Sequence, residues 1–194
     1  MNCEGKELAV RYFKGGKEYT HRCSKVLEKI EKSRKSRGEN AGGRVNQKYW
    51  MHLKHLGEQY AHQVSLNIVT FCKEQDVSII AFPKYDEEYR RHVLKGAGNF
   101  GTLHLSTRIR EYLTYKAWKE GILVLDVNAK ETHRICAICG SEITQQDKES
   151  KRFVCEEGHQ GDAYLNVARN AAKRCMEQFR KKAGKEKNVS AKKS

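Results

Sequence analysis

The chain has 194 residues, 38% of them hydrophobic, and a formal net charge of +14 with a pI near 9.5. This composition allows one domain of ordinary size with a small appendage, and it points to an acidic partner, most commonly nucleic acid. No stretch approaches the ~18 apolar residues that span a bilayer, so an anionic membrane surface is the weaker alternative. The chain start lacks an apolar signal region and the cysteines suit a reducing compartment, from which we expect a cytoplasmic, nucleoid-associated protein.

The first part of the chain predicts a strand pair followed by a basic helix. Alternation over residues 8–13 indicates a strand, residues 14–17 are a turn signal, and Tyr19 would lie in the returning strand. Residues 21–37 then predict a basic helix, and the Ser-, Gly- and charge-rich residues 33–43 predict a flexible loop.

Two apolar runs and two helices fill the middle of the chain. The longest helical pattern covers residues 44–75 and repeats apolar residues at steps of three or four, namely Val45, Tyr49, Leu53, Leu56, Tyr60, Val64, Ile68 and Phe71. The elements expected after it are a buried strand over 77–82 that Pro83 ends, a surface loop over 84–101, a helix over 105–119 and a buried strand over 122–127. Strand, helix and strand in this order predict a βαβ unit with parallel neighbours.

Three cysteines and a histidine near the carboxy-terminal end have the spacing of a metal site. Cys136 and Cys139 stand two residues apart, and Cys155 and His159 follow after a segment that suits a short β-hairpin. Thiolates and imidazoles in two such pairs are typical of a tetrahedral zinc site, so we expect a structural zinc ribbon over residues 130–161. His133 is an alternative fourth ligand. Few large apolar residues lie in this segment, so metal binding would drive its folding.

A helix with an apolar face is expected over residues 163–179 after the ribbon. The last residues are strongly basic, and we expect residues 181–194 to be a disordered tail that is attracted to phosphates.

Several of these segments, taken in order, resemble one family. They are the run from Leu113 to Asn128, Thr132, the Cys136–Cys139 knuckle, Lys151 to Cys155, and Asn166-Val-Ala-Arg-Asn170. This series resembles the carboxy-terminal half of the TnpB (OrfB) proteins of bacterial transposons and of the type V CRISPR effectors. The resemblance implies an α/β fold of the RNase H-like (RuvC) type, a mixed sheet flanked by helices with an inserted zinc ribbon. It divides the chain into a RuvC-like region over 1–129, the ribbon over 130–161 and a final RuvC helix over 162–180.

The resemblance also implies a guide RNA and DNA cleavage by two Mg²⁺ ions that three carboxylates hold. The sequence departs from that pattern at each carboxylate. The opening strand with the first aspartate is not expected in this chain, Ala81 and Phe82 occupy the place of the glutamate, and Tyr164 that of the last aspartate. Asp162 is either a displaced ligand or the N-cap of the following helix, and we favour the cap.

These departures favour a nuclease-dead protein that binds a guide-type RNA, DNA or both, as a regulator or as a subunit of a larger RNA-guided complex. A partner chain or a second copy would then supply the missing amino-terminal part. The alternatives are a Mg²⁺-dependent RuvC-like DNA endonuclease that uses Asp162, with its triad completed in trans, and a transposon remnant.

Basic residues on three predicted helices are the candidates for nucleic-acid contact. They are Arg22, Lys25, Lys29, Lys32, Arg34, Lys35 and Arg37 on the first helix and its loop, Arg108 and Arg110 on the second, and Arg169, Lys173 and Arg174 on the last. Tyr49, Trp50 and Trp118 are assigned to the core.

Overall fold

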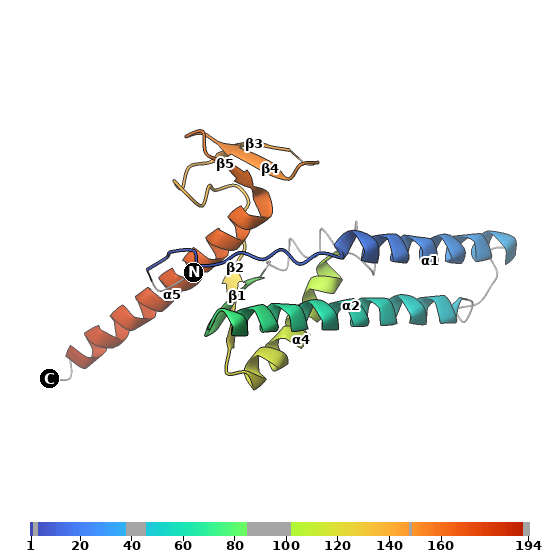
Figure 1. The fold of residues 1–194 in the computed structure, drawn as a ribbon, viewed down its shortest axis with the longest axis horizontal. Coiled ribbons are helices and arrows are strands. Elements are labelled where there is room, and N and C mark those ends of the chain that lie inside the picture. The colour runs from blue at the N-terminus through green and yellow to red at the C-terminus, as the bar shows by residue number, and fades with distance from the viewer. Residues whose placement is uncertain (2–3, 38–45, 85–101, 148, 192–194) are drawn as a thin grey trace. The chain divides into compact units, whose positions relative to one another are not determined.

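A computed structural model describes residues 1, 4–37, 46–84, 102–147 and 149–191 (Figure 1). Its elements, in chain order, are α1 (Gly16–Arg37), α2 (Gln47–Glu74), β1 (Ile79–Lys84), α4 (Thr102–Lys119), β2 (Leu123–Asn128), β3 (Ile143–Gln146), β4 (Arg152–Cys155), β5 (Gln160–Asp162) and α5 (Ala163–Ala191). The predicted mixed α/β fold class is confirmed. The chain divides into two compact units, one of residues 11–78 and 90–123 and the other of residues 1–10, 79–89 and 124–194. In the described residues, no helix combines the length and the apolarity that a membrane crossing requires.

The first unit is helical, and α2 packs against both α1 and α4. Between α1 and α2 the core consists of Cys23, Val26, Ile30 and Leu53, with the rings of Tyr19 and Tyr49 packed against it. Val26 and Ile30 lie one turn apart on the buried face of α1.

The buried face of α2 is centred on small residues rather than on the large apolar ones that the pattern selected. The fully buried positions are Leu53, Gly57, Ala61, Ser65, Val69 and Cys72, whereas the predicted Leu56, Tyr60, Val64, Ile68 and Phe71 are half-buried. Steps of four place these small residues on one ridge of the helix, where they allow another helix to approach closely. Leu113 and Ala117 of α4 are completely buried in the same unit.

The second unit contains the sheets and α5. Strands β1 and β2 form a two-stranded sheet. The amide of Leu123 donates to the carbonyl of Ser78, and the amide of Ala129 donates to that of Lys84, at 2.9 and 3.0 Å. Partners therefore advance in the same direction on both strands, which makes the pair parallel, as the predicted βαβ unit requires. Helix α5 packs against β1.

Four local predictions are wrong. Residues 6–15 form no strand in the structure, and α1 begins at Gly16, so the strand pair around the 14–17 turn does not form. Residues 33–37 belong to α1, while the rest of the predicted loop lies outside the described residues. Pro83 lies inside β1 rather than after it. Helix α5 continues to Ala191 through most of the segment expected to be disordered.

Candidate metal centre and basic surfaces

The metal centre is built on a small antiparallel sheet. Strand β4 pairs with β3 on one side and with β5 on the other. Phe153 lies opposite Gly161, where an added Cβ would come within 3.0 Å of the Phe153 ring. The absent side chain at Gly161 thus leaves room for Phe153, which clusters with Cys136, Cys155 and the partly buried Ile143. This core contains one large buried apolar side chain, so apolar burial contributes little to the stability of the segment.

The structure brings together the four predicted ligands, Cys136, Cys139, Cys155 and His159. Their ligand atoms all lie within 4.8 Å of one another. The sulfurs of Cys139 and Cys155 are 3.7 Å apart, and the Cys155 sulfur lies 3.5 Å from Nδ1 of His159. A tetrahedral zinc ion with ordinary bond lengths places two sulfurs about 3.8 Å apart, and a sulfur and an imidazole nitrogen about 3.6 Å apart. The residues therefore fit a four-coordinate metal ion of that size, and His133 lies outside the cluster.

Two glycine turns position the ligands. The Gly140 amide donates to the Cys136 carbonyl at 2.9 Å, and the Gly158 amide donates to the Cys155 carbonyl at 2.9 Å. Both glycines have positive φ, 84° and 78°, a backbone region that side chains other than glycine rarely adopt. Each turn bends the chain so that the two ligands of a pair face one point. The glycine at position 158 is therefore part of the site, although a more symmetric ribbon would have a cysteine there.

The thiols of the cluster differ in acidity. Hydrogen bonds from the side chain and the backbone amide of Ser141 lower the pKa of Cys139 to about 6. Burial raises the pKa of Cys155. The exposed thiol is therefore the more readily ionised of the two, which suits it to meet an incoming cation first.

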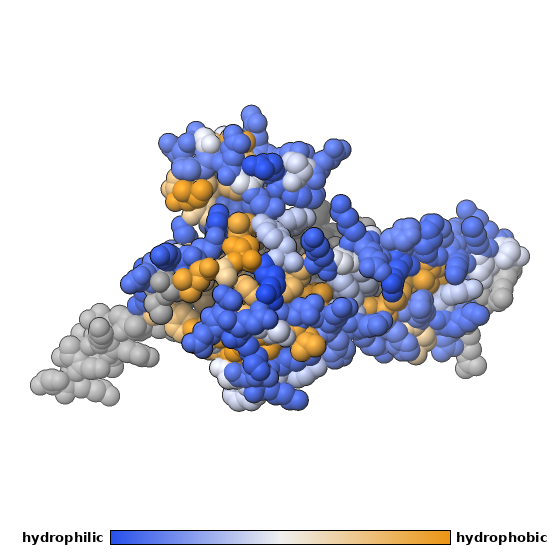
Figure 2. Space-filling model, viewed as in Figure 1, coloured by the Kyte–Doolittle hydropathy of each residue, from blue (hydrophilic) through white to orange (hydrophobic). Residues whose placement is uncertain are grey.

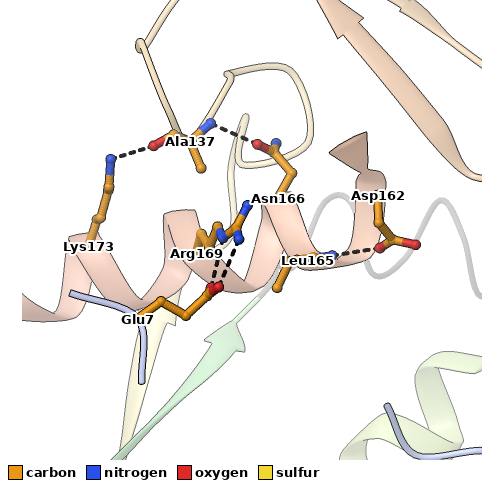
Figure 3. A network of polar contacts seen from close by, with 7 residues as sticks. All are labelled: Glu7, Ala137, Asp162, Leu165, Asn166, Arg169 and Lys173. Carbon is orange, nitrogen blue, oxygen red and sulfur yellow. Dashed lines mark hydrogen bonds and ion pairs between the residues drawn. The ribbon is translucent and has the colours of Figure 1, made fainter. Parts of the chain in front are cut away.

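Two buried asparagines of α5 hold the segment around Cys136 and Cys139, and Figure 3 shows one of them, Asn166. The side-chain oxygen of Asn166 accepts from the Ala137 amide at 2.7 Å, and its amide nitrogen donates to the Ile135 carbonyl at 2.8 Å. Asn170 donates to the carbonyls of Thr132 and Ile135 at 2.9 and 2.8 Å. Both side chains are at least nine-tenths buried. The sequence series contains these asparagines, but their part in supporting the ribbon appears only in the structure.

The three predicted nucleic-acid contacts on α5 make hydrogen bonds within the chain. Arg169 donates two hydrogen bonds of 2.8 Å to the carboxylate of Glu7, and Lys173 donates to the Ala137 carbonyl (Figure 3). Arg174 donates to the carbonyls of Asn128 and Lys130 at 2.7 and 2.6 Å. These cations satisfy polar groups of the chain itself, so they are weaker candidates for phosphate contact than the sequence indicates.

Asp162 lies at the amino-terminal end of α5, where its Oδ1 accepts a hydrogen bond of 2.8 Å from the Leu165 amide (Figure 3). This is the contact of a helix N-cap, the reading that the sequence favoured. Within the described ranges, the four ribbon residues are the one group of three or more His, Cys, Asp or Glu side chains close enough to share a metal ion. In the described residues, Asp162 therefore does not lie close to two further acidic side chains that could hold a metal ion with it.

The cations of α1 from Lys17 to Lys35 are exposed, and several form pairs along the helix. Arg22, Lys25 and Lys35 form ion pairs with glutamates three or four residues away. Among the described residues, Lys29, Lys32 and Arg34 have no such pair, and Lys29 lines a cavity of about 270 Å³ with Lys48 and His52 of α2. Hydrophilic residues dominate the face shown in Figure 2, with apolar residues in separate patches.

The remaining predicted contact residues and the three aromatic residues assigned to the core lie as follows. Arg108 is half-buried, and its guanidinium lies over Gly57, where an added Cβ would be 2.7 Å from Nη1.

Trp50 and Trp118, which the sequence assigned to the core, are 42% and 76% exposed. Tyr49 does pack against the α1–α2 core. Arg110 is half-buried, and Arg37 ends α1.

Two comparisons identify similar proteins. Residues 107–171 match the family model "Cas12f1-like, TNB domain". The structure is similar to a chain in a cryo-EM structure of the Cas12f1–sgRNA–target DNA complex, with a TM-score of 0.62 and 15% sequence identity. The similarity covers 84% of this chain and 44% of that chain, so this chain spans less than half of the Cas12f1 length. No curated protein matches. Residues 107–171 are therefore similar to a domain found in Cas12f1-like proteins, and the fold of this chain resembles that of the Cas12f1 chain, as the resemblance to type V effectors predicted.

Proposed function

We propose that this relative of the TnpB and type V effector proteins binds a guide-type RNA, DNA or both without cutting, as a regulator or as a subunit of a larger RNA-guided complex. The observation that carries this proposal is the use of Asp162 as a helix cap, with Tyr164 at the motif position of the last aspartate. The solved relative is in complex with sgRNA and target DNA, which supports nucleic acid as the partner class.

The absence of cutting follows from the chemistry of the proposed site. Two-metal phosphodiester cleavage requires several carboxylates that converge on a pair of Mg²⁺ ions. The described acidic side chains form no cluster of three or more, and strand β1 has Ala81 and Phe82 where the family pattern has its glutamate. Without these charges, the chain would not concentrate Mg²⁺ at a phosphate. A triad completed by another chain is the alternative to test.

Nucleic-acid binding is supported by charge. The net charge of +14 favours association with a polyanion, and binding through many phosphate contacts weakens steeply with salt. The best-placed side chains are Lys29, Lys32 and Arg34 of α1, which are exposed and have no ion pair in the described part of the chain, with Lys48 and His52 lining the same cavity as Lys29. Arg22, Lys25 and Lys35 could exchange their glutamate partners for phosphate, because exposed ion pairs contribute little stability.

The ribbon is proposed to hold one structural Zn²⁺ through Cys136, Cys139, Cys155 and His159. Four protein ligands close the coordination shell and leave no position for a reacting water. The ion would supply the folding free energy that the small core around Phe153 lacks. Asn166 and Asn170 would then present the folded ribbon from α5.

The zinc assignment predicts a specific response to metal removal. Purified protein should contain about one zinc per chain, and Co²⁺ substitution should produce the intense thiolate-to-metal charge-transfer bands of a site with several sulfur ligands. His159→Ala should lower Co²⁺ affinity at least tenfold, whereas His133→Ala should leave it unchanged. Equal effects of the two variants, measured by titration of the Co²⁺ spectrum, would refute the proposed ligand set.

The binding proposal is tested by the RNA that the protein carries. The protein would be purified from its native host at low salt, and the bound RNA sequenced. One discrete RNA species supports the guided function. A random mixture of fragments, or no RNA together with no affinity for DNA, contradicts it.

A further inference from the structure

Three aromatic side chains follow one another along α4 at steps of three residues: Tyr112, Tyr115 and Trp118. Their exposure increases along the helix, from the half-buried Tyr112 to 43% for Tyr115 and 76% for Trp118. No other large hydrophobic side chain in the described part of the chain is as exposed as Trp118. Removing an indole ring from water is strongly favourable, so this ring is a candidate for contact with a partner.

Helix α2 fixes the start of this row. The His62 ring stacks on Tyr112 with centroids 3.8 Å apart and planes 10° apart, and the Tyr115 hydroxyl lies 3.5 Å from Nδ1 of His62. Lys116 donates to the His62 carbonyl at 2.6 Å and to the Ser65 hydroxyl at 2.7 Å. These contacts hold the Tyr115 side of α4 in place, which lowers the entropy cost of presenting its ring.

Positive charge lies beside the same rings. The Lys116 ammonium is 5.9 Å from the ring centroids of both Tyr112 and Tyr115, and the Lys119 ammonium is 6.0 Å from that of Tyr115. Of the two acidic residues nearby in the sequence, Glu120 pairs with Lys73 at 2.7 Å, and Glu111 lies one turn before Tyr115. The surface therefore combines the exposed rings of Tyr115 and Trp118 with the exposed Lys119, while the Lys116 ammonium is hydrogen-bonded to α2.

We propose that Tyr115 and Trp118 form a stacking platform for unpaired bases of single-stranded nucleic acid, with Lys119 neutralising an adjoining phosphate. The inference rests on the proposed nucleic-acid function. It adds that the ligand is single-stranded and that it binds at the carboxy-terminal end of α4. Every base offers a π face, so such a platform is tolerant of sequence. Two rings with lysines beside them match a base and its phosphate better than they match a protein interface, which needs a larger continuous apolar area.

The test separates base stacking from phosphate attraction. Binding of the full chain to fluorescein-labelled (dT)12 would be compared with binding to an abasic oligonucleotide of the same length and charge. Trp118→Ala should weaken (dT)12 binding about tenfold, the order expected for one lost stacking contact, and leave abasic binding unchanged. Trp118→Phe should retain most of the affinity. Leu66→Ala, which removes another exposed apolar side chain of the same unit, is the matched control and should change neither.

A fluorescence measurement gives a second readout. In Trp50→Phe protein, Trp118 is the remaining tryptophan, and its emission should be quenched by (dT)12 and not by the abasic strand. The platform is overturned if Trp118→Ala weakens binding of (dT)12 and of the abasic oligonucleotide equally. It is also overturned if Trp118 emission stays unquenched at saturating (dT)12. If neither oligonucleotide binds wild-type protein that carries a discrete RNA, the platform alone is overturned. If the protein carries no RNA and binds neither oligonucleotide, the proposed function itself fails. Circular dichroism melting confirms that each variant is folded.

Discussion

Individual side chains of α5 determine how the ribbon is supported. The side-chain amide of Asn166 accepts a hydrogen bond from the Ala137 amide and donates one to the Ile135 carbonyl, and Lys173 donates to the Ala137 carbonyl. An asparagine can satisfy a buried amide and a buried carbonyl at once, which a carboxylate or an apolar residue cannot. The two asparagines of the Asn166–Asn170 motif therefore have a structural role at the ribbon, through hydrogen bonds to its backbone.

Asn166→Ala should destabilise the protein by about 2–3 kcal/mol, because the buried amide of Ala137 loses its acceptor. Gln178→Ala, at an exposed position of the same helix, is the control and should change stability by less than about 0.5 kcal/mol. Thermal and urea unfolding of the zinc-loaded proteins measure both effects. Equal stability of the two variants would mean that the asparagine does not support the ribbon.

The pair of Glu7 and Arg169 predicts a pH dependence. Hydrogen bonding to Arg169 lowers the pKa of Glu7 in the folded protein. The resulting stability is fully present above the unfolded pKa, near 4.5, and is lost as the pH falls through the lower folded value. Because the pair is about one-third exposed, Glu7→Gln should cost roughly 0.5–1 kcal/mol at pH 7 and nothing well below pH 4.

The exposed pair of Glu18 and Arg22 is the control for this measurement. Glu18→Gln should have a smaller effect at pH 7, because both side chains of that pair are more than half exposed. A Glu7→Gln penalty that persists unchanged at low pH would show that the carboxylate charge is not its origin.

At the scale of elements, a ridge of small buried residues on α2 lets neighbouring helices pack closely in the helical unit. Gly57, Ala61 and Ser65 are buried at successive turns, and the Arg108 guanidinium crosses α2 at Gly57. This packing requires that large side chains be absent from the ridge. A hydrophobicity pattern selects large apolar residues, so it does not predict the ridge.

Gly57→Leu should destabilise the helical unit by more than about 2 kcal/mol, because its side chain would displace Arg108 and the Tyr19 hydroxyl, which an added Cβ meets at 2.7 and 3.3 Å. Gly57→Ala should cost less, since the flexible end of Arg108 can move. Asn67→Leu on the exposed face of α2 serves as the control. If Gly57→Leu unfolds at the same urea concentration as Asn67→Leu, the ridge is not a close-packed contact.

The sequence predicts elements well where one strong local signal exists. Helices α2, α4 and the start of α5 follow from apolar periodicity, and the ligand set follows from cysteine spacing. The alternation over residues 8–13 gave a wrong strand because alternation does not supply a pairing partner, and Leu8, Val10 and Tyr12 are exposed in an extended segment. Trp118 was placed in the core because a hydrophobic residue on a helix is usually buried, and exposure depends on the tertiary contacts of α4.

At the scale of the whole molecule, the net charge fits the proposed nucleic-acid partner. The net charge of +14 favours a polyanion, and the solved relative is in complex with RNA and DNA. Several cations of α5 are held by the chain itself, so the proposed binding surfaces are α1 with the facing part of α2, and the aromatic end of α4. Each surface lies within the helical unit, whereas the ribbon and α5 belong to the other.

The central claim is that the chain binds nucleic acid and leaves it intact. The most direct measurement incubates the purified protein and the RNA it carries with end-labelled matching DNA in the presence of Mg²⁺ or Mn²⁺, and follows binding and cleavage in the same samples. The account predicts saturable binding with no cleavage, and the same result for Asp162→Asn protein. Metal-dependent cleavage that Asp162→Asn abolishes would contradict it.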